Sequence, residues 1–583
     1  MKFQTFVITL CIASLAACAA DKQDHQQSAN NPSTMHPVKI GERELTDTDP
    51  GKPDSPPGVV GVHEEIAYTS VDRALLMKHA QPGLASTAVA QQDYRRAFEP
   101  LYRESYQHLE SQSVTRVSDN PVSTFSIDVD TGAYSNMRRW LNQGQLPPED
   151  AVRIEEFINY FNYDYPQPDD RQVPFAVSTE MAKTPWNPNT HLLRIGIQGY
   201  TVPKRELPAS NLVFLLDVSG SMNSADKLPL LQQALAMLVG QLDQSDHISI
   251  VVYAGASGIV LPPTSGDKKA DILAALQQLQ AGGSTNGAAG IRLAYQLAQQ
   301  NLIANGVNRV ILATDGDFNV GLANTEELID LIQSKRNAVI ALTTLGFGSG
   351  NYNDHLLEQL ADEGNGNHAY IDKLNEARKV LAEELSATLL TIAKDVKIQV
   401  EFNPARVSEY RLIGYENRAL NEEDFNNDKV DAGEIGAGHR VTALYEISLA
   451  SSDGQRLPGR RYQQDNTDTQ NDSGAFANEL AHLRVRYKLP GSSSSKLVES
   501  AILDKQIKAH GSDSFNFAAA VAAFGQKLRG GTFLENFDYP DIAELARHSR
   551  GNDAHGYRSE FMQLVNLAAT LDQTSNVAQI NQK

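Results

Sequence analysis

The clearest chemistry in the sequence lies where apolar runs end in oxygen-bearing side chains. The stretch L-V-F-L-L-D-V-S-G-S-M at 212–222 places an acid and two alternating serines directly after five apolar residues. A glycine-bracketed loop, G-G-S-T-N-G, and a second apolar run, V-I-L-A-T-D, supply another hydroxyl and another acid. The candidate ligands are Asp217, Ser219, Ser221, Thr285 and Asp315. All offer oxygen and none offers nitrogen or sulfur, which suits Mg²⁺ or Mn²⁺ and not zinc.

This donor set would leave a bound ion incomplete. Mg²⁺ prefers six oxygen ligands at about 2.0–2.1 Å and usually keeps some water. The hydroxyls and two carboxylates cannot fill all positions, and with only two acids the ion stays electrophilic. A carboxylate from another molecule would fill an open position well. The pattern therefore predicts a metal site with an open position for a partner's carboxylate.

A simpler interpretation treats the two serines as helix caps. Serines that follow strands often accept hydrogen bonds from the first turn of the next helix. Asp226, just before Lys227, is better placed for that cap. Capping would also leave Thr285 and Asp315 unexplained, so we prefer the metal site.

The sequence contains only partial matches to motifs of known enzymes. Ser493-x-x-Lys496 and Ser118-Asp119-Asn120 match two motifs of penicillin-binding proteins, but in reversed order and without K-T-G. Asp128-Val129-Asp130-Thr131 approaches a phosphotransferase pattern, but its threonine comes one residue early, so we expect a turn or a structural network. A metal-assisted hydrolase stays open as an alternative. It would need a general base, and no histidine or glutamate adjoins the metal motif in sequence.

Two acidic stretches resemble calcium loops only in part. Asp315-x-Asp317-x-Asn319 has its glycine one place late, and Asp424-x-Asn426-x-Asp428 has Ile435 where the final acid belongs. We interpret residues 424–435 as a solvated acidic loop, with weak Ca²⁺ binding left open. The alternating basic residues Arg484, Arg486 and Lys488 are expected to be solvated or to pair with local acids.

The elements that must position the metal ligands lie in residues 208–388. Solid apolar runs alternate there with amphipathic helical stretches, which predicts an α/β fold with a doubly wound, mostly parallel sheet. Expected strands are 212–216, 247–253, 309–313, 338–345 and 368–371, and expected helices are 227–242, 268–280, 287–303, 325–336, 353–362 and 374–388. Ligands of such sheets bind beyond the carboxyl ends of the strands, where the five candidate residues fall.

The flanking regions show a different period. Apolar and polar residues alternate at 193–198, 396–402 and 483–489, which predicts antiparallel strands with one wet face. Because such strands occur on both sides of the middle region, we expect the α/β block to be inserted in a β-sandwich-like domain. The expected parts are 66–207 (helices, then strands), 208–388 (the α/β block), 389–495 (β-rich) and 496–583 (helical).

The N-terminus has the features of a secreted lipoprotein. A short apolar stretch follows Lys2, too short to span a bilayer, and L-A-A-C resembles the lipobox of bacterial lipoproteins. That resemblance implies a signal peptide at 1–17 and lipid attachment at Cys18. Ala19 follows where an aspartate would favour the inner membrane, so we expect the outer membrane of a Gram-negative cell. Residues 18–65 are polar and proline-rich, as in a disordered tether.

Charge and cysteine content narrow the function further. The formal net charge of −20 argues against a nucleic-acid partner, because phosphate binding needs basic patches. Cys11 would leave with the signal peptide and Cys18 would carry the lipid, so the folded body has no cysteine. Disulfides, thiolate zinc sites and cysteine nucleophiles are therefore excluded from that body.

The motif and its context resemble a known family. D-V-S-G-S at 217–221, Thr285 and T-D-G at 314–316 resemble the metal-ion-dependent adhesion site of von Willebrand factor type A domains. The resemblance implies that both serines and the threonine can touch the metal, that the aspartates act directly or through water, and that a ligand donates an acidic side chain. It also implies that loop shifts can couple binding to movement of the last helix.

The rest of the chain resembles one bacterial group, the YfbK-like lipoproteins. The supporting stretches are N-P-V-S-T-F-S-I-D-V-D-T-G-A-Y at 120–134 and D-K-V-D-A-G-E-I-G-A-G-H at 428–439. We therefore expect a non-enzymatic, lipid-anchored protein on the periplasmic or surface face of the outer membrane, which holds Mg²⁺ or Mn²⁺ and binds an acidic group of a protein partner. The alternatives are a metal-assisted envelope hydrolase and an envelope scaffold in which the metal site is secondary.

Overall fold

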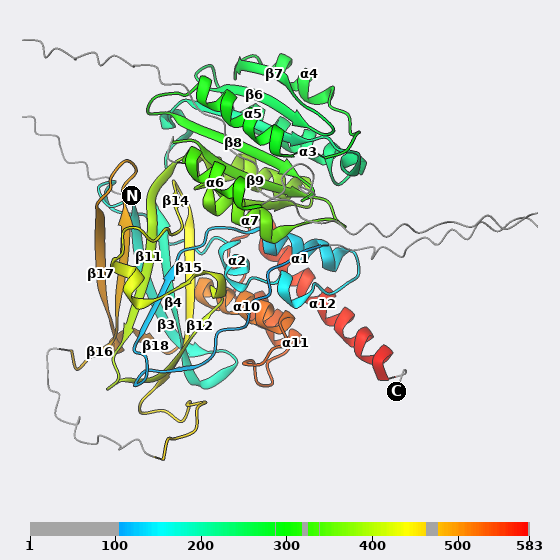
Figure 1. The fold of residues 1–583 in the computed structure, drawn as a ribbon. Coiled ribbons are helices and arrows are strands. Elements are labelled where there is room, and N and C mark those ends of the chain that lie inside the picture. The colour runs from blue at the N-terminus through cyan, green and yellow to red at the C-terminus, as the bar shows by residue number, and fades with distance from the viewer. Residues whose placement is uncertain (1–103, 286, 317–324, 337–338, 462–475, 581–583) are drawn as a thin grey trace, which may run out of the picture. The chain divides into compact units, whose positions relative to one another are not determined.

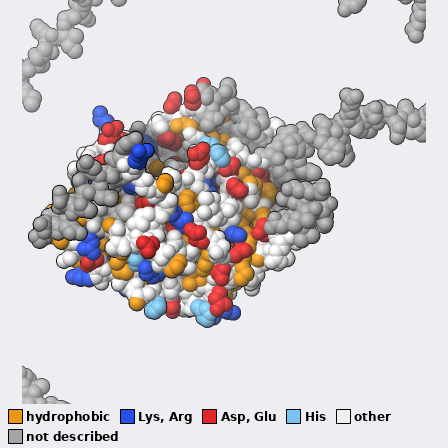
Figure 2. Space-filling model, turned by 90° about the horizontal axis from the view of Figure 1, so that it is seen from below, with side chains coloured by type: hydrophobic (Ala, Val, Ile, Leu, Met, Phe, Trp, Pro, Cys, Tyr) orange, Lys and Arg blue, Asp and Glu red, His pale blue; other side chains and the backbone are white. Residues whose placement is uncertain are grey.

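Residues 104–285, 287–316, 325–336, 339–461 and 476–580 are described by a computed structural model. The predicted signal peptide, Cys18 and the tether at 18–65 lie outside these residues, as do Asp317 and Asn319. Among the described helices, none is both long and apolar enough to cross a membrane. Acidic, basic and apolar side chains are interspersed on the face seen in Figure 2.

The middle of the chain forms one six-stranded sheet with the order β10-β9-β8-β5-β6-β7 (Figure 1). Its strands are β5 (Ser210–Asp217), β6 (His247–Tyr253), β7 (Ser257–Ser265), β8 (Val307–Thr314), β9 (Ala341–Phe347) and β10 (His368–Ile371). All neighbouring pairs are parallel except β6 with β7. The parallel strands therefore deliver their carboxyl ends to one edge of the sheet, as predicted.

Helices cover both faces of this sheet. Helices α3 (Leu228–Gln241), α4 (Lys269–Gln277) and α8 (Leu374–Arg378) share a core with Phe214 and Leu216 of β5. Helices α5 (Gly287–Gln300), α6 (Thr325–Arg336) and α7 (Asp354–Glu363) share a second core with Val213 and Leu215. Since alternate side chains of β5 enter opposite cores, the strand must be apolar on both faces, and the doubly wound prediction is confirmed.

Two details of this region differ from the expectation. Strand β7 was not predicted, because its sequence S-G-I-V-L-P-P-T-S contains Pro262 and Pro263, which are tolerated at a sheet edge but obscure the strand pattern. The single helix expected at 374–388 is divided into α8, a π-helical turn at Lys379–Glu383 and α9 (Leu385–Leu389).

The flanking strands form two further sheets that share one core. One sheet has the order β1 (Thr115–Arg116), β12 (Val407–Ile413), β15 (Arg440–Leu449), β4 (Asn187–Gly199), β3 (Phe175–Thr184) and β18 (Ile507–Lys508). The other has the order β13 (Ala419–Leu420), β2 (Val122–Ser126), β11 (Thr391–Phe402), β16 (Glu479–Lys488) and β17 (Ser495–Leu503), with β14 (Ile435–Gly436) paired to β11. Phe402 of one sheet contacts Tyr445 of the other, with ring centroids 5.4 Å apart.

These strands come from both sides of the α/β block, which confirms its insertion in a β-sandwich-like domain. The two connections differ in length. Residues 200–209 join β4 to β5, whereas Leu390 alone separates α9 from β11. Strand β11 lies between β2 and β16 and pairs with both.

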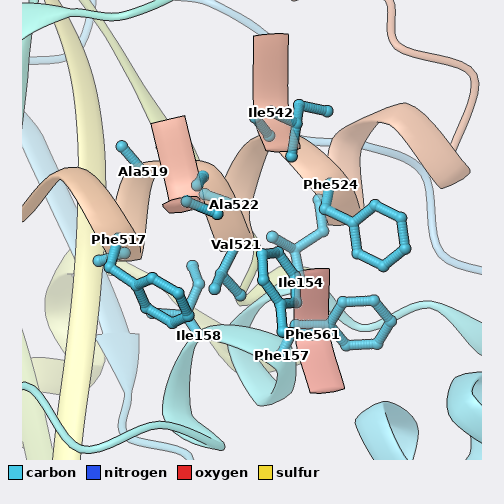
Figure 3. Packing of buried hydrophobic residues seen from close by; sticks show 14 of the residues in the cluster. Ile154, Phe157, Ile158, Phe517, Ala519, Val521, Ala522, Phe524, Ile542 and Phe561 are labelled. Carbon is cyan, nitrogen blue, oxygen red and sulfur yellow. The ribbon is translucent and has the colours of Figure 1, made fainter. Parts of the chain in front are cut away.

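The C-terminal helices α10 (Asp513–Leu528), α11 (Tyr539–His548) and α12 (Tyr557–Ile580) pack on two helices from the start of the described chain, α1 (Gly132–Asn142) and α2 (Ile154–Asn159). Figure 3 shows Phe517, Val521 and Phe524 of α10 directed toward this shared core. Gly530 and Gly531 follow α10 with φ of +90° and +67°, a left-handed conformation that commonly ends a helix.

The expected segment type after 496 was wrong. This region does not begin as helix, because β17 occupies Ser495–Leu503 and the helices start at Asp513. Of the residues of β17 only Ile502 is fully buried, so this edge strand shows little of the period-two pattern. In the described part of 66–207, helices α1 and α2 do precede strands β3 and β4, but the two short strands β1 and β2 come before them and were not expected.

Candidate metal centre

The turn after β5 brings the first three predicted ligands together. Asp217 is the last residue of β5, and its Oδ1 accepts a hydrogen bond of 2.8 Å from the Ser219 backbone N–H. The Oγ atoms of Ser219 and Ser221 lie 3.0 Å apart. Asp217 and Ser219 are buried and Ser221 is half-buried. The D-x-S-x-S spacing therefore places two hydroxyls side by side at the end of the strand.

Neighbouring strands hold the second oxygen of Asp217. Oδ2 accepts from the Thr314 hydroxyl of β8 at 3.0 Å and from the Tyr253 hydroxyl of β6 at 3.2 Å. Burial, with the nearby Asp315 charge, raises the pKa of Asp217 to about 6, against the lowering effect of its hydrogen bonds. The carboxyl group is thus fixed in orientation and would be stabilised as an anion by a cation beside it.

The loop that carries Thr285 is joined to the turn after β5 by backbone hydrogen bonds. The Gly220 N–H donates to the Gly283 carbonyl at 3.0 Å, and the Gly282 N–H donates to the Val218 carbonyl at 2.8 Å. Gly283 has a φ of +85°, a conformation that glycine adopts without strain. Thr285 is buried next to this junction in the sequence. The G-G-S-T stretch therefore reaches the same edge of the sheet as Asp217.

Asp315 directly follows β8, which pairs with β5. It is buried, and its Oδ2 accepts a hydrogen bond of 2.8 Å from Nζ of Lys227. The next residue, Gly316, has a φ of +89°, and a Cβ there would approach the Asn353 backbone nitrogen to 2.3 Å. A glycine is required at this point of the turn, which explains the G in T-D-G.

Lys227 is the residue at this site that the sequence did not reveal. Its side chain is only 9% exposed and runs along Gly348, where a Cβ would meet Lys227 Cε at 2.3 Å. No local motif marks a lysine at the start of a helix as a partner of an acid that follows another strand. The expectation that Asp226 caps α3 is wrong, because Lys227 occupies the N-cap position without a side-chain cap and Asp226 accepts from Ser224.

The residues present fit a small hard cation. The turns after β5 and β8 and the 282–285 loop meet at one edge, and they contribute hydroxyl and carboxylate oxygens. Lys227 supplies one positive charge to Asp315, while Asp217 receives only neutral donors. The site can therefore hold Mg²⁺ or Mn²⁺ through hydroxyls, with Asp217 as the nearest uncompensated acid. We refer below to Asp217, Ser219, Ser221, Thr285 and Asp315 as the strand-end site.

The other motifs are occupied by structural contacts. Asp128 Oδ1 accepts from the Asp130 N–H at 3.0 Å, and Asp130 Oδ1 accepts from the His368 N–H at 2.9 Å, so D-V-D-T belongs to a structural network as expected. Burial raises the pKa of Asp130 well above its ordinary range, with the Asp128 charge adding to the effect. Asp119 of the S-D-N match pairs with Arg460.

The acidic loop at 424–435 faces the basic strand residues. Asp424 lies in the first turn of the short 3₁₀ helix, and its carboxylate accepts a hydrogen bond from the backbone N–H of the N-cap residue Asn421. The Asp428 carboxylate accepts from Arg486 at 3.0 Å, Lys488 Nζ lies 2.7 Å from Asp395, and Arg484 lies 3.9 Å from Glu401. Of the two expectations for Arg484, Arg486 and Lys488, pairing with local acids is therefore the one that the structure confirms.

Three models of known protein families match separate ranges of the chain. Residues 211–384 match the model of the von Willebrand factor type A domain, and residues 100–194 match a model described as von Willebrand factor. Residues 387–571 match the model "Uncharacterized protein YfbK, C-terminal". The matched middle range agrees with the α/β block, and the C-terminal match spans β11 to α12.

Individual proteins show the same likeness. The uncharacterized protein YfbK of Escherichia coli (strain K12) is 49% identical over 471 residues, which are 79% of this chain and 80% of that protein. Inter-alpha-trypsin inhibitor heavy chain H3 of Mesocricetus auratus is 24% identical over 264 residues, 42% of this chain and 29% of that protein. A solved structure of a von Willebrand factor type A protein from Catenulispora acidiphila, at 16% identity, covers 67% of this chain and 89% of its own with a TM-score of 0.37.

The fold and the family matches agree on the α/β block, the sandwich strands around it and the C-terminal helices. With 49% identity across most of both chains, this chain belongs to the YfbK family of von Willebrand factor type A domain proteins.

Proposed function

We propose that this protein binds an acidic group of a protein partner through a divalent cation held at the strand-end site. The cation is Mg²⁺ or Mn²⁺, and its residues are Asp217, Ser219, Ser221, Thr285 and Asp315. The observation that carries the proposal is the pair of adjacent hydroxyls, 3.0 Å apart, beside a buried carboxylate that is held by hydroxyls of two flanking strands. A bound cation would supply a Lewis-acidic position for a partner's carboxylate.

The chain's own residues prepare that position. Thr314 and Tyr253 fix one oxygen of Asp217, and the Ser219 amide fixes the other. The ammonium group of Lys227 partly neutralises the negative charge of the Asp315 carboxylate. The site then has little more than one uncompensated acid, so it favours a ligand that brings a further negative charge.

The same contacts argue against the hydrolase alternative. Metal-assisted hydrolysis requires a base that takes a proton from water. Both acids of the site have other partners: Asp217 accepts three hydrogen bonds, and Asp315 pairs with Lys227. We therefore propose a binding protein and not an enzyme.

We also propose that the protein is a lipoprotein of the outer membrane. The lipobox-like L-A-A-C at 15–18 and the polar tether of 18–65 support this. Acyl chains on Cys18 would anchor the body without spanning the bilayer. Labelling with a radioactive or alkyne-bearing fatty acid tests the anchor, and Cys18→Ser should abolish the label.

Calorimetry with Mg²⁺ on the wild type and on Asp217→Ala tests the site. Wild type should bind one ion, and Asp217→Ala should bind at least about a hundredfold more weakly, a difference of about 2.7 kcal/mol. Asp243→Ala is the matched control, because Asp243 is a solvent-exposed acid in the same domain. Equal binding by wild type and Asp217→Ala would refute the site.

Crosslinking with mass spectrometry, with and without EDTA, tests the partner. A partner that crosslinks only without EDTA and only to Asp217-containing protein supports metal-mediated binding. If the same partner crosslinks equally well to Asp217→Ala, with and without EDTA, the scaffold alternative is correct. Mg²⁺-dependent turnover of an ester or phosphate substrate, lost in Asp217→Ala, would support the hydrolase instead.

A further inference from the structure

A second group of oxygen ligands lies where the α/β domain meets the segment that precedes it in sequence. Asp128 follows β2, Glu156 belongs to α2, and Glu358 belongs to α7 of the α/β domain. One carboxylate oxygen of each lies within 4.8 Å of the others. The three side chains are 2%, 0% and 4% exposed. We call these three residues the carboxylate cluster.

The surroundings of the carboxylate cluster are rich in acids. Arg153 pairs with Glu156 and Asp354, and its Nη1 lies 3.4 Å from Glu358 Oε2. Arg418 lies 2.6 Å from Asp362, 3.3 Å from Glu358 and 3.5 Å from Asp128, and it also reaches Asp130. Two guanidinium groups thus form ion pairs with six carboxyl groups, those of Asp128, Asp130, Glu156, Asp354, Glu358 and Asp362.

Two oxygens of the carboxylate cluster have no hydrogen bond. Within the described residues, Asp128 Oδ2 and Glu358 Oε2 are buried without a donor. The other oxygens are used: Asp128 Oδ1 accepts from the Asp130 N–H, and Glu358 Oε1 accepts from the Asn417 side chain at 2.7 Å. Glu358 Oε2 still has the Arg153 guanidinium nitrogen Nη1 3.4 Å away, whereas Asp128 Oδ2 accepts no hydrogen bond from the described residues. A buried carboxylate oxygen without a donor is unfavourable, so Asp128 Oδ2 is the atom that points to a missing positive charge.

We propose that the carboxylate cluster holds a buried Ca²⁺ ion. Ca²⁺ takes six to eight oxygen ligands at about 2.3–2.6 Å. Because the three ligand atoms lie within 4.8 Å of one another, a point exists within about 2.8 Å of all of them, close to the length of a Ca–O bond. The carboxylate cluster offers carboxylates alone, whereas the strand-end site includes three hydroxyls.

The position of this ion gives it a structural role. Two of its ligands come from the segment before the α/β domain and the third comes from α7 of that domain. The same junction is held by Arg153 and by the bond from the His368 N–H to Asp130. The ion would therefore fix the α/β domain to the segment that contains D-V-D-T. This inference does not depend on metal binding at the strand-end site.

The test uses the full chain with Asp217→Ala, so that the strand-end site does not contribute. After treatment with a chelator, the protein is titrated with Ca²⁺ alone by calorimetry, and bound ions are counted by native mass spectrometry. We expect one Ca²⁺ per chain and a thermal midpoint that rises by several degrees. A chain that binds no Ca²⁺ under these conditions overturns the proposal.

A second substitution assigns the ion to the cluster. Adding Glu358→Gln should weaken Ca²⁺ binding at least about a hundredfold and remove the thermal shift, whereas Glu363→Gln on the same helix should leave both unchanged. Asp128→Asn repeats the test from the other side of the junction if the first variant does not fold. Undiminished Ca²⁺ binding in a folded Glu358→Gln or Asp128→Asn variant would place the ion elsewhere, for example at 424–435, and refute the assignment. Mg²⁺ titration of the Asp217 variants reports separately on the strand-end site.

Discussion

The strand-end site and the carboxylate cluster both gather oxygen ligands, but they differ in composition and in position. The strand-end site combines hydroxyls with two acids, one of them paired with Lys227, and it includes the half-buried Ser221. The carboxylate cluster consists of three buried acids at the junction of two parts of the chain. A hydroxyl-rich site with one half-buried ligand suits an ion that takes a further ligand, whereas an enclosed set of acids suits an ion that fixes structure.

The largest effect is expected at the enclosed site. Arg153→Met should lower the free energy of unfolding by about 3–5 kcal/mol, because it leaves buried acids without their counter-charge. Chemical denaturation monitored by circular dichroism measures this change in the free energy of unfolding. Arg205→Met, whose side chain is 85% exposed, is the control and should change stability by less than about 0.5 kcal/mol. A loss of similar size in both variants would contradict the structural role of Arg153.

The hydroxyl pair separates the two sites directly. Ser219→Ala with Ser221→Ala should weaken Mg²⁺ binding about a hundredfold, since two ligands are lost at about 1–1.5 kcal/mol each. Ca²⁺ binding at the carboxylate cluster should stay unchanged. Ser224→Ala, whose hydroxyl donates to Asp226 at an exposed position, serves as the control in the same calorimetric titration. If the double variant keeps the Mg²⁺ affinity of wild type, the hydroxyls are not ligands.

Acidification should weaken Mg²⁺ binding at the strand-end site. Burial raises the pKa of Asp217 to about 6, so lowering the pH from 7.5 to 5 protonates this carboxyl group in the free protein. A cation must then displace the proton, and the apparent affinity should fall about tenfold. Calorimetry at the two pH values measures this, with circular dichroism to confirm the fold at pH 5. An affinity independent of pH would show that Asp217 does not carry the binding.

The smallest effect is expected from Lys227. Its ammonium group lies 2.8 Å from Asp315 and repels a cation at the same site. Lys227→Met should therefore strengthen Mg²⁺ binding by up to about tenfold, and Lys204→Met, a solvent-exposed lysine, should not. Weaker Mg²⁺ binding in Lys227→Met would instead mean that this lysine holds Asp315 in its binding position.

The sequence predicted the parts of the fold whose patterns are local and strong. Strand β5 and helix α5 were expected within a few residues of their observed bounds, because a fully buried strand and an apolar helix face have clear periods. Strand β17 was missed because, as an edge strand, it buries only Ile502 completely. A helix was expected at 374–388, but its division into three pieces was not predicted, since the pieces follow one continuous helical pattern in the sequence.

The same contrast holds for the two sites. Four of the strand-end residues end or follow β5 or β8 at short spacings, and Thr285 lies in a glycine-bracketed loop between α4 and α5. These local features match the family motif, so the five residues could be proposed from the sequence. Lys227 and the carboxylate cluster depend on distant contacts. Glu156 and Glu358 are separated in sequence by β3, β4 and most of the α/β domain, and Asp128 was seen only as half of an incomplete phosphotransferase pattern. Their proximity follows from the insertion of one domain in another, which no local spacing records.

The unequal connections of the α/β domain have a mechanical consequence. Residues 200–209 lead into the domain, but Leu390 alone joins its last helix, α9, to β11. Strand β11 pairs with β2 and β16 on its two sides. A force applied at the strand ends of the α/β domain would therefore have its shortest path to the sandwich through Leu390, and it would enter the centre of a sheet and not its edge.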